Sequence, residues 1–437
     1  RQFYMAGFSD EAGLNNEIRF SQKSLSIKVC QTKDNFMSTF KKNFSVVFAL
    51  VMATSCLTAH ALEESQDSRS RSQWVATWGS PPMAQQPARE PKDNDPGFVP
   101  ISFENQTVRQ IAPISLGGHR VRIRVSNAFG IKQLRVGSAH VALQADGAAI
   151  VPGSDRVLKF GGLPSISIPA GAVAVSDPID LAVSSKANLA VSLYLPTDTG
   201  PATFFEATVH DSYVSGPGDF TGASTLQSPK TIKSRFFLSV VEVSARGNAG
   251  TVVAIGDSVT KGATSTSWPG FLFERFGSNY GTSRLAVVNQ GIGCGRLLLD
   301  NCGPNAASRF DRDVLTVTGA THVIVALGLV DIIFPSAFGI PGETVTASDV
   351  IVGLKQLVER AHAQKLPIYG ATITPFGGSF FPNVFTPENE AVRKAVNHWI
   401  RTSGAFDSVI DFDAAVRDPN DPKSFWSIYT VDGIHPN

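Results

Sequence analysis

Three polar side chains in this sequence could together activate a nucleophile. Ser258 lies in the segment TVVAIGDSVTKG, and Asp432 and His435 lie three residues apart in VDGIHPN. A serine hydroxyl becomes reactive when a base removes its proton, and that base needs a third group to hold it in one tautomer. Ser258, His435 and Asp432 supply these three parts, as nucleophile, base and orienting carboxylate.

The residues before Ser258 predict its place in the fold. Val252–Ile255 is a continuous apolar run, which is typical of a parallel strand covered on both faces. Ligands of open α/β sheets bind at the carboxyl ends of such strands, and the N–H groups that begin the next helix favour negative charge. Taken alone, GDS is better explained as a strand-to-helix turn with Ser258 as the N-cap. The pair of Asp432 and His435 is what favours catalysis.

An alternation of strands and helices follows Gly250. One helix is predicted after Ser348, the expected N-cap, and another begins at Pro387 and stops at Gly404. This rhythm predicts an α/β domain over residues 250–437, with a doubly wound parallel sheet and right-handed crossovers. The expected strands are Thr251–Ile255, Leu285–Asn289, His322–Leu327, Pro367–Ile373 and Asp407–Phe412.

Residues 105–245 show a different pattern. Short stretches of alternating apolar and polar residues, separated by turn-forming residues, predict an antiparallel β-sandwich domain. Arg120, Arg122 and Arg124 share one face of a predicted strand, which we interpret as solvated, although such a stripe could bind an anionic or sugar ligand. The preceding residues 62–104 predict a short strand and a Pro-rich surface loop, and the tryptophans of the strand are expected to pack in a core.

The N-terminal region resembles an export signal. We interpret residues 1–36 as upstream sequence. Within residues 37–61, two lysines precede the apolar run Phe44–Leu57, which ends near an Ala-His-Ala sequence, the pattern of a cleavable signal peptide. The run is too short to span a bilayer. We therefore expect cleavage after Ala61, export to the periplasm or the cell exterior, and no stable membrane insertion, with a lipid anchor at Cys56 as the alternative.

Composition and cysteine positions limit the other possibilities. At 437 residues and 43% hydrophobic content, the chain is long enough for two domains. A net charge of +1 gives no reason to expect nucleic acid as a partner. Cys294 and Cys302 follow the expected cleavage site and could form one disulfide in an oxidising compartment. No C-x-x-C pair or histidine cluster suggests a metal site.

The GDS and DGIHP segments, in this order and at this separation, resemble the SGNH (GDSL-type) serine esterases and acylhydrolases. The segments WVATW, NQTVRQIAPISLGGHRVRIRVSNAFG and RFDRDVL are similar to secreted members with an N-terminal β-domain. The resemblance implies a flavodoxin-like parallel sheet with helices on both faces after an antiparallel β-sandwich. It also implies hydrolysis of carboxylic esters without a metal or organic cofactor, by Ser258, His435 and Asp432, with Gly256 and Asp257 as motif support.

The second block of the family pattern is altered at Cys294. The sequence NQGIGCGR contains Gly291 and Gly293, but it has Cys294 where a glycine that forms the oxyanion hole is expected. The backbone N–H survives this change. If the position requires a positive φ, the added Cβ costs about 1 kcal/mol or more.

The third block departs further. Its usual form is G-x-N-D, and here Gly328 and Asp331 flank Val330 in place of the asparagine whose amide would donate to the oxyanion. Losing one such donor typically lowers kcat by about 100- to 1,000-fold. We considered Asn301 or Asn305 as a substitute donor.

These observations predict an exported, slow ester hydrolase acting on small-molecule, glycan or lipid esters. The resemblance also implies a closing helix after His435, so either the chain is C-terminally truncated or its catalytic histidine lies on a loosely held terminus. The alternative, favoured by Val330, is a non-catalytic carbohydrate- or surface-binding protein on a decayed hydrolase scaffold. The oligomeric state stays open.

Overall fold

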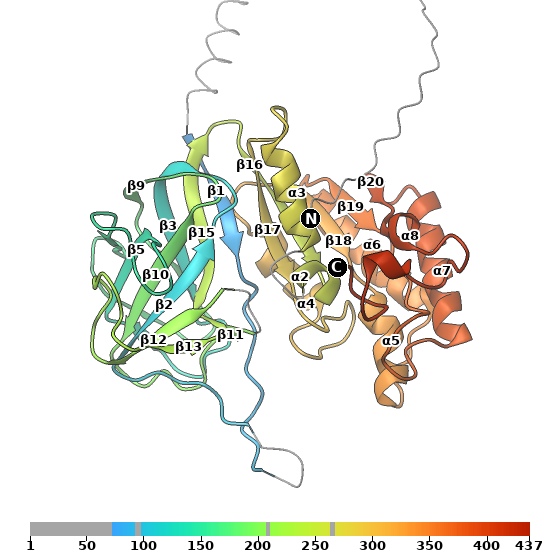
Figure 1. Cartoon of the computed structure of the whole chain (residues 1–437), viewed down its shortest axis with the longest axis horizontal. Helices are drawn as coiled ribbons and strands as arrows, with labels where there is room; N and C mark the ends of the chain where they lie inside the picture. Colours follow the sequence, from blue (N-terminus) through green and yellow to red (C-terminus); the bar gives the residue numbers. More distant parts are fainter. Residues whose placement is uncertain (1–71, 92–97, 207–209, 263–266) are drawn as a thin grey trace, which may run out of the picture. The chain divides into compact units, whose positions relative to one another are not determined.

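The computed structural model describes residues 72–91, 98–206, 210–262 and 267–437. The expected signal peptide at 37–61 and the upstream residues 1–36 lie outside these ranges. The described residues belong to one compact unit. Antiparallel sheets form its N-terminal part, and a parallel sheet with helices forms its C-terminal part (Figure 1).

Two antiparallel sheets enclose the larger N-terminal core, which confirms the predicted β-sandwich. Their alternating apolar residues face inward, as Val121 and Ile123 do from one sheet and Val191 and Leu193 from the other. The first sheet has the order β1 (Ser72–Gly79), β15 (Leu238–Arg246), β3 (Gly118–Ser126), β8 (Val173–Val175), and β9 (Ile179–Val183) also pairs with β3. The second has the order β13 (Lys230–Ile232), β12 (Ser212–Pro217), β2 (Gln106–Pro113), β10 (Asn188–Leu195), β5 (Ser138–Leu143), β6 (Arg156–Val157). Two short pairs complete this part: β11 (Phe204–Phe205) with β14 (Arg235–Phe236), and β4 (Leu134–Val136) with β7 (Ile166–Ile168).

The arginine stripe of β3 is not the solvated face that we expected. Arg122 and Arg124 both contact Glu242 of the neighbouring strand, at 2.5 and 2.6 Å, and the Glu242 side chain is fully buried. Arg124 also donates to the carbonyl of Thr316 in the C-terminal part. The interpretation was wrong for these two arginines because their buried carboxylate partner is distant in sequence.

The C-terminal part is built on a five-stranded parallel sheet, as the sequence predicted. All five expected strands are present, with bounds that differ by a few residues. The strand before Ser258 has a neighbouring strand on each side, so its carboxyl end is flanked by the carboxyl ends of both neighbours. The order is β17 (Leu285–Gly291), β16 (Gly250–Gly256), β18 (Ala320–Ala326), β19 (Ile368–Ala371), β20 (Ser408–Ile410).

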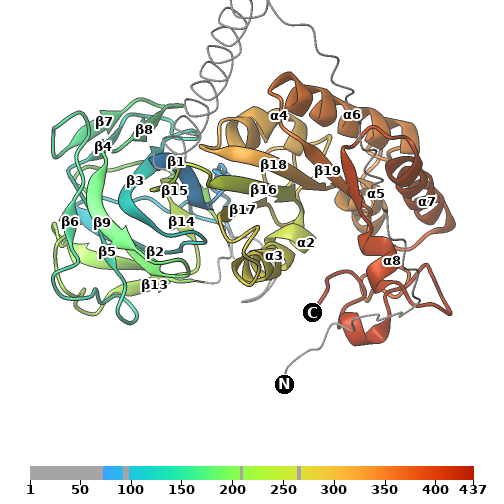
Figure 2. The same ribbon diagram turned by 90° about the horizontal axis from the view of Figure 1, so that it is seen from above.

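Helices cover both faces of this sheet (Figure 2). Leu272 of α3 (Trp268–Gly277) packs with Val252 and Ile324 on one face, and Leu354 of α6 (Ala347–Ala363) packs with Val253 on the other. The two apolar clusters explain why these strands are continuously apolar. None of the helices in the described ranges is long and apolar enough to cross a membrane. The helices are α2 (Ser258–Lys261), α3 (Trp268–Gly277), α4 (Ala306–Phe310), α5 (Leu329–Phe338), α6 (Ala347–Ala363), α7 (Pro387–Thr402) and α8 (Phe412–Val416), and a π-helical turn (Asp311–Leu315) follows α4.

Helix caps show where local sequence was ambiguous. Helix α7 begins at Pro387 and ends near Gly404, as predicted. Helix α6 is capped by Thr346, not by Ser348 as we expected. Thr346 forms a capping box with Asp349, in which each side chain accepts from the other residue's backbone N–H. Ser348 offers no such partner three residues later, so the earlier residue caps the helix.

Strand β1 joins the two parts beside the edge strand β17. The Ala76 N–H donates to the Thr318 carbonyl at 2.8 Å, and the Thr251 hydroxyl donates to the Ala76 carbonyl at 2.8 Å. The Val287 N–H of β17 donates to Ser115 Oγ at 3.1 Å. These bonds place the first antiparallel sheet against the edge of the parallel sheet.

Candidate active site

Ser258 lies directly after β16 and begins α2. The N-cap of α2 is Asp257, whose Oδ1 accepts from the Val259 N–H at 2.9 Å, so the interpretation of Ser258 as the cap was wrong. The Ser258 hydroxyl instead lies 2.8 Å from His435 Nε2. The half-buried Ser258 side chain therefore has a base within hydrogen-bonding distance.

Asp432 fixes the orientation of this base. Its Oδ2 lies 2.6 Å from His435 Nδ1, while Oδ1 accepts from the N–H groups of Ile434 and His435 at 2.9 and 2.8 Å. Burial opposes ionisation, but the hydrogen bonds from the His435 ring and from these two N–H groups outweigh it and lower the pKa of Asp432 to about 2. The carboxylate is therefore ionised near neutral pH, and it holds the imidazole with Nε2 towards Ser258.

The loop that carries His435 is tied down at several points. The Thr430 hydroxyl donates to the His435 carbonyl at 2.7 Å and accepts from the Gly433 N–H at 3.0 Å. The Asp432 carbonyl accepts from the Phe380 N–H at 3.1 Å. Gly433 has φ +76° and lies so close to another loop that a Cβ would come within 2.3 Å of a carbonyl oxygen. These contacts tie the loop that carries the base to its neighbours.

The loop after β17 packs against the turn that presents Ser258. The Ile292 N–H donates to the Gly256 carbonyl at 3.1 Å. A Cβ on Gly291 would lie 2.4 Å from the backbone nitrogen of Lys261. A Cβ on Gly256 would lie 1.9 Å from the Thr260 hydroxyl and 2.7 Å from the Ala326 carbonyl oxygen. The glycines at 256 and 291 thus permit the close approach of two backbones.

Cys294 occupies the strained position that the sequence raised as a possibility. Its φ is +46°, which a residue with a Cβ rarely adopts, whereas the φ of neighbouring Gly293 and Gly295 is not positive. Cys294 forms a disulfide with Cys302, with the Cα atoms 5.7 Å apart. The disulfide closes the loop that carries the Cys294 N–H.

The third block forms the start of α5. Gly328 has φ +106° and caps the helix, and Val330 and Asp331 are buried. Asp331 accepts from the Leu297 and Leu298 N–H groups at 2.7 and 3.0 Å. Burial raises the pKa of Asp331, and these two hydrogen bonds oppose that rise. Asp331 therefore ties the loop after Cys294 to the helix that begins at the end of β18.

Neither asparagine that we considered as a substitute for Val330 is free for that role. Asn301 Nδ2 donates to the Cys294 carbonyl at 3.2 Å. Asn305 caps α4 by accepting from the Ser308 N–H, and its amide donates to Asp300. Both side chains therefore stabilise the loop rather than point an N–H donor at the Ser258 hydroxyl.

Arg309 is a positioning residue that sequence reasoning did not assign. Its Nη1 donates to the Gln290 carbonyl at 2.8 Å, and its Nη2 donates to the Gly256 carbonyl at 3.3 Å. The guanidinium is buried and also pairs with Asp313. It thereby links the ends of β16 and β17, the strands that precede Ser258 and Cys294. The signal in the sequence was the RFDRDVL segment, which the resemblance included without a role.

The raised pKa of the buried Asp257 carboxyl predicts that the stability of the fold decreases as the pH rises. Burial raises its pKa to about 7, although the Val259 N–H and the nearby His435 favour the carboxylate. Below about pH 4 the carboxyl is protonated in both folded and unfolded chains, and between about pH 4 and pH 7 only the unfolded chain readily loses the proton. The free energy of unfolding of the wild type should therefore fall relative to that of Asp257→Asn, by up to about 4 kcal/mol. Urea unfolding of both proteins across this range measures the difference, and parallel curves would contradict the assignment.

Among the residues that the structure describes, no group of three His, Cys, Asp or Glu side chains could hold a metal ion. At Ser258, a hydroxyl, an imidazole and a carboxylate form a row in which each group lies within hydrogen-bonding distance of the next. This geometry can transfer a proton from the hydroxyl to the imidazole during attack on a carbonyl.

Several solved structures resemble part of the chain, including a lipase and an esterase. A GDSL-like lipase from Bacteroides thetaiotaomicron is 16% identical, and the alignment covers 43% of this chain and 80% of that one, with a TM-score of 0.33. An acetylxylan esterase from Geobacillus stearothermophilus is 17% identical, with coverage of 43% and 87% and a TM-score of 0.34. No curated protein matches the chain.

The sequence model of the GDSL-like lipase/acylhydrolase family matches residues 254–437. The matched range begins in β16 and contains Ser258, Asp432 and His435, together with the loops after β17 and β18. Residues 254–437 of this chain are therefore similar to the GDSL-like lipase/acylhydrolase family.

Proposed function

We propose that the chain is an exported serine ester hydrolase that forms an acyl-enzyme at Ser258. The observation that carries the proposal is the pair of distances at His435, 2.8 Å to Ser258 Oγ and 2.6 Å to Asp432 Oδ2. His435 Nε2 takes the hydroxyl proton as Ser258 Oγ attacks the ester carbonyl, and it then gives that proton to the leaving alcohol. Water, activated by the same imidazole, releases the acid in the second step.

The developing oxyanion would be held by backbone donors. The Ser258 N–H is the first of α2 and has no acceptor within the helix. The Cys294 N–H donates no hydrogen bond to any residue in the described ranges. Two backbone N–H groups and the positive end of a helix favour negative charge at this point. The proposed substrates are carboxylic esters with small acyl groups, on a small molecule, a glycan or a lipid.

Hydrolysis and labelling together test this proposal. The purified chain should hydrolyse p-nitrophenyl acetate or butyrate, and a fluorophosphonate should stop turnover by adding one group to the peptide that contains Ser258. Mass spectrometry locates the label, and chain unfolded before labelling serves as the control. Folded protein that neither turns over these esters nor takes up the label would sink the proposal and favour the non-catalytic binding protein.

Restoring the missing amide donor should accelerate the reaction. Val330 is buried at the start of α5, where the family pattern has an asparagine. Val330→Asn is expected to raise kcat by at least about tenfold, because one oxyanion donor is typically worth about 100- to 1,000-fold. It should also lower the free energy of unfolding by about 1–3 kcal/mol, because a buried amide lacks a partner when no substrate is bound.

The control for Val330→Asn is Val330→Thr. Threonine is similar in size to valine and replaces one methyl group with a hydroxyl, but it does not reproduce the amide donor. Steady-state kinetics and urea unfolding on both variants separate the two effects. An unchanged kcat in folded Val330→Asn would show that this side chain does not reach the oxyanion.

A further inference from the structure

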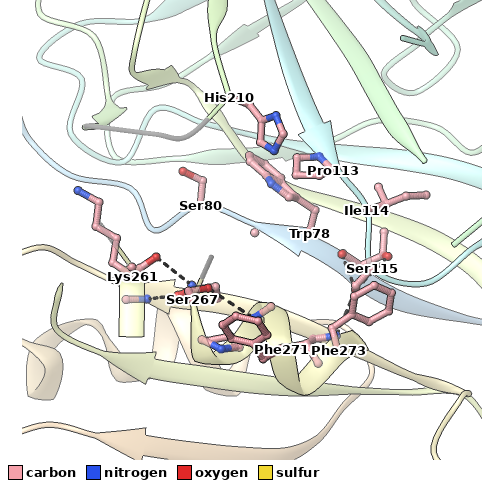
Figure 3. A pocket seen from close by; sticks show the side chains of 18 of the residues that line it. Trp78, Ser80, Pro113, Ile114, Ser115, His210, Lys261, Ser267, Phe271 and Phe273 are labelled. Carbon is pink, nitrogen blue, oxygen red and sulfur yellow. Dashed lines mark hydrogen bonds between the residues drawn. The ribbon is translucent and has the colours of Figure 1, made fainter. Parts of the chain in front are cut away.

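A cavity of about 480 Å³ lies between the N-terminal sheets and α3. Trp78 of β1 and Ile114, which follows β2, line one side, while Phe271 and Phe273 of α3 line the other (Figure 3). Its volume is in the range of sites for drug-sized ligands, about 300–1,000 Å³. None of the described residues that line it is Ser258, Asp432 or His435. The cavity is therefore separate from the triad, although Lys261 at the end of α2 reaches it.

One end of the cavity contains buried polar groups with unused hydrogen-bonding capacity. Ser80 and Arg235 are only 4% and 3% exposed, and Ser80 Oγ and Arg235 Nε have no hydrogen-bond partner among the residues that the structure describes. Arg235 Nη1 donates to the carbonyls of His210 and Asp211, which fixes the guanidinium. Buried polar atoms are seldom left without partners, so the pair indicates a missing acceptor.

Lys261 adds a second cation at the same end. Its ammonium lies 5.4 Å from the ring centroid of Phe205, and Phe205 pairs with Arg235 in the β11–β14 ladder. Figure 3 shows Lys261 and Ser80 at one end of the cavity and Ile114, Phe271 and Phe273 at the other. Within the described ranges, no carboxylate lies at salt-bridge distance from Lys261, although Glu206 acts on it at longer range. Burial lowers the pKa of Arg235 to about 10, although the nearby Asp211 opposes this fall, and the guanidinium stays charged near neutral pH.

The rest of the cavity is apolar or already satisfied. Trp78 lies between the two ends (Figure 3). Lys186 is neutralised by Glu274. Four further polar side chains are engaged within the protein: Thr77 donates to the Leu116 carbonyl, Ser115 to the Thr77 carbonyl and Asn289 to the Thr260 carbonyl, and Ser267 accepts from the Gly270 N–H. A ligand with many hydroxyl groups would find few free partners here.

We propose that this cavity binds an organic monocarboxylate with an apolar or aromatic body. The carboxylate accepts from Arg235 Nε, Ser80 Oγ and the Lys261 ammonium, which supplies the missing acceptor and places one negative charge beside two cations. The body lies along Trp78 towards Phe271 and Phe273, where apolar area and ring stacking stabilise it. The proposal concerns binding alone and does not depend on turnover at Ser258.

Calorimetry on the purified full chain tests the ligand class. Cinnamate represents an aromatic acid and octanoate an aliphatic one, and binding of either at one site supports the proposal while identifying the body that fits. Cinnamamide, which keeps the shape without the charge, should bind at least about tenfold more weakly. Glucuronate should bind more weakly than both acids. Equal affinity for cinnamate and cinnamamide, or no saturable binding of either acid, would overturn it.

Variants locate the bound acid. Ser80→Ala and Lys261→Met should each weaken binding by about tenfold, because a hydrogen bond to a charged group is lost. Lys186→Met is the matched control, because it removes the same charge from the same cavity at the opposite end, and it should change the affinity by less than about twofold. Ser258→Ala should bind as the wild type does. Folded Ser80→Ala and Lys261→Met proteins with unchanged affinity, or loss of binding in Ser258→Ala, would place the acid elsewhere and refute the proposal.

Discussion

Replacing Ser258 with alanine is expected to lower kcat for p-nitrophenyl esters by about 10⁴-fold or more, to the background rate. The hydroxyl is 2.8 Å from His435 Nε2, so it is the group from which this base can take a proton. Alanine keeps the backbone N–H and the Asp257 cap of α2, so the fold should be retained. Kinetics and urea unfolding on the same preparations measure both expectations.

The matched control is Ser308→Ala. Ser308 is exposed on α4, close in sequence to the loop that carries Cys294, and its hydroxyl donates only to the Asn305 carbonyl. Its kcat should stay within about threefold of the wild type, since exposed changes away from a site are nearly neutral. If folded Ser258→Ala retains wild-type turnover, then Ser258 is not the nucleophile and another group must be sought.

The fold could be predicted from sequence because its signals are local. Strand β16 is continuously apolar since helices cover both faces of the sheet, and α7 carries its cap and its first-turn proline in sequence. The convergence of Ser258 with Asp432 and His435 followed from the family resemblance. Choices between adjacent capping residues were less secure. Asp257 and Ser258 are both good N-caps, and only the backbone geometry of the turn decides between them.

What could not be predicted depends on partners distant in sequence. Glu242 neutralises Arg122 and Arg124 from the neighbouring strand, and Arg309 connects the ends of two strands through their carbonyls. Trp78 packs against the N-terminal core, as expected, but it also lines the cavity between the N-terminal sheets and α3, which the sequence did not indicate. Such placements arise from the packing of whole sheets, which no local pattern encodes.

Replacing Asp432 with asparagine is expected to lower kcat by about 10⁴-fold without unfolding the chain. Asp432 Oδ1 accepts from two backbone N–H groups, so the amide oxygen of an asparagine would take that place and its NH₂ would face His435 Nδ1. The imidazole would then carry its proton on Nε2 and present an N–H donor, not a lone pair, to Ser258. A base in this tautomer cannot take the hydroxyl proton.

Asp257→Asn provides the comparison, because it makes the same substitution beside the same serine. An amide oxygen at 257 can still accept from the Val259 N–H, and the Asp257 pKa of about 7 means that the neutral form is already well populated near neutral pH. Its kcat should therefore change by less than about tenfold. In the double variant Ser258→Ala/Asp432→Asn, turnover should fall no further than in Ser258→Ala, because the three groups act as one unit. Equal losses in Asp432→Asn and Asp257→Asn would mean that general damage to the loop, and not the tautomer of His435, accounts for the effect.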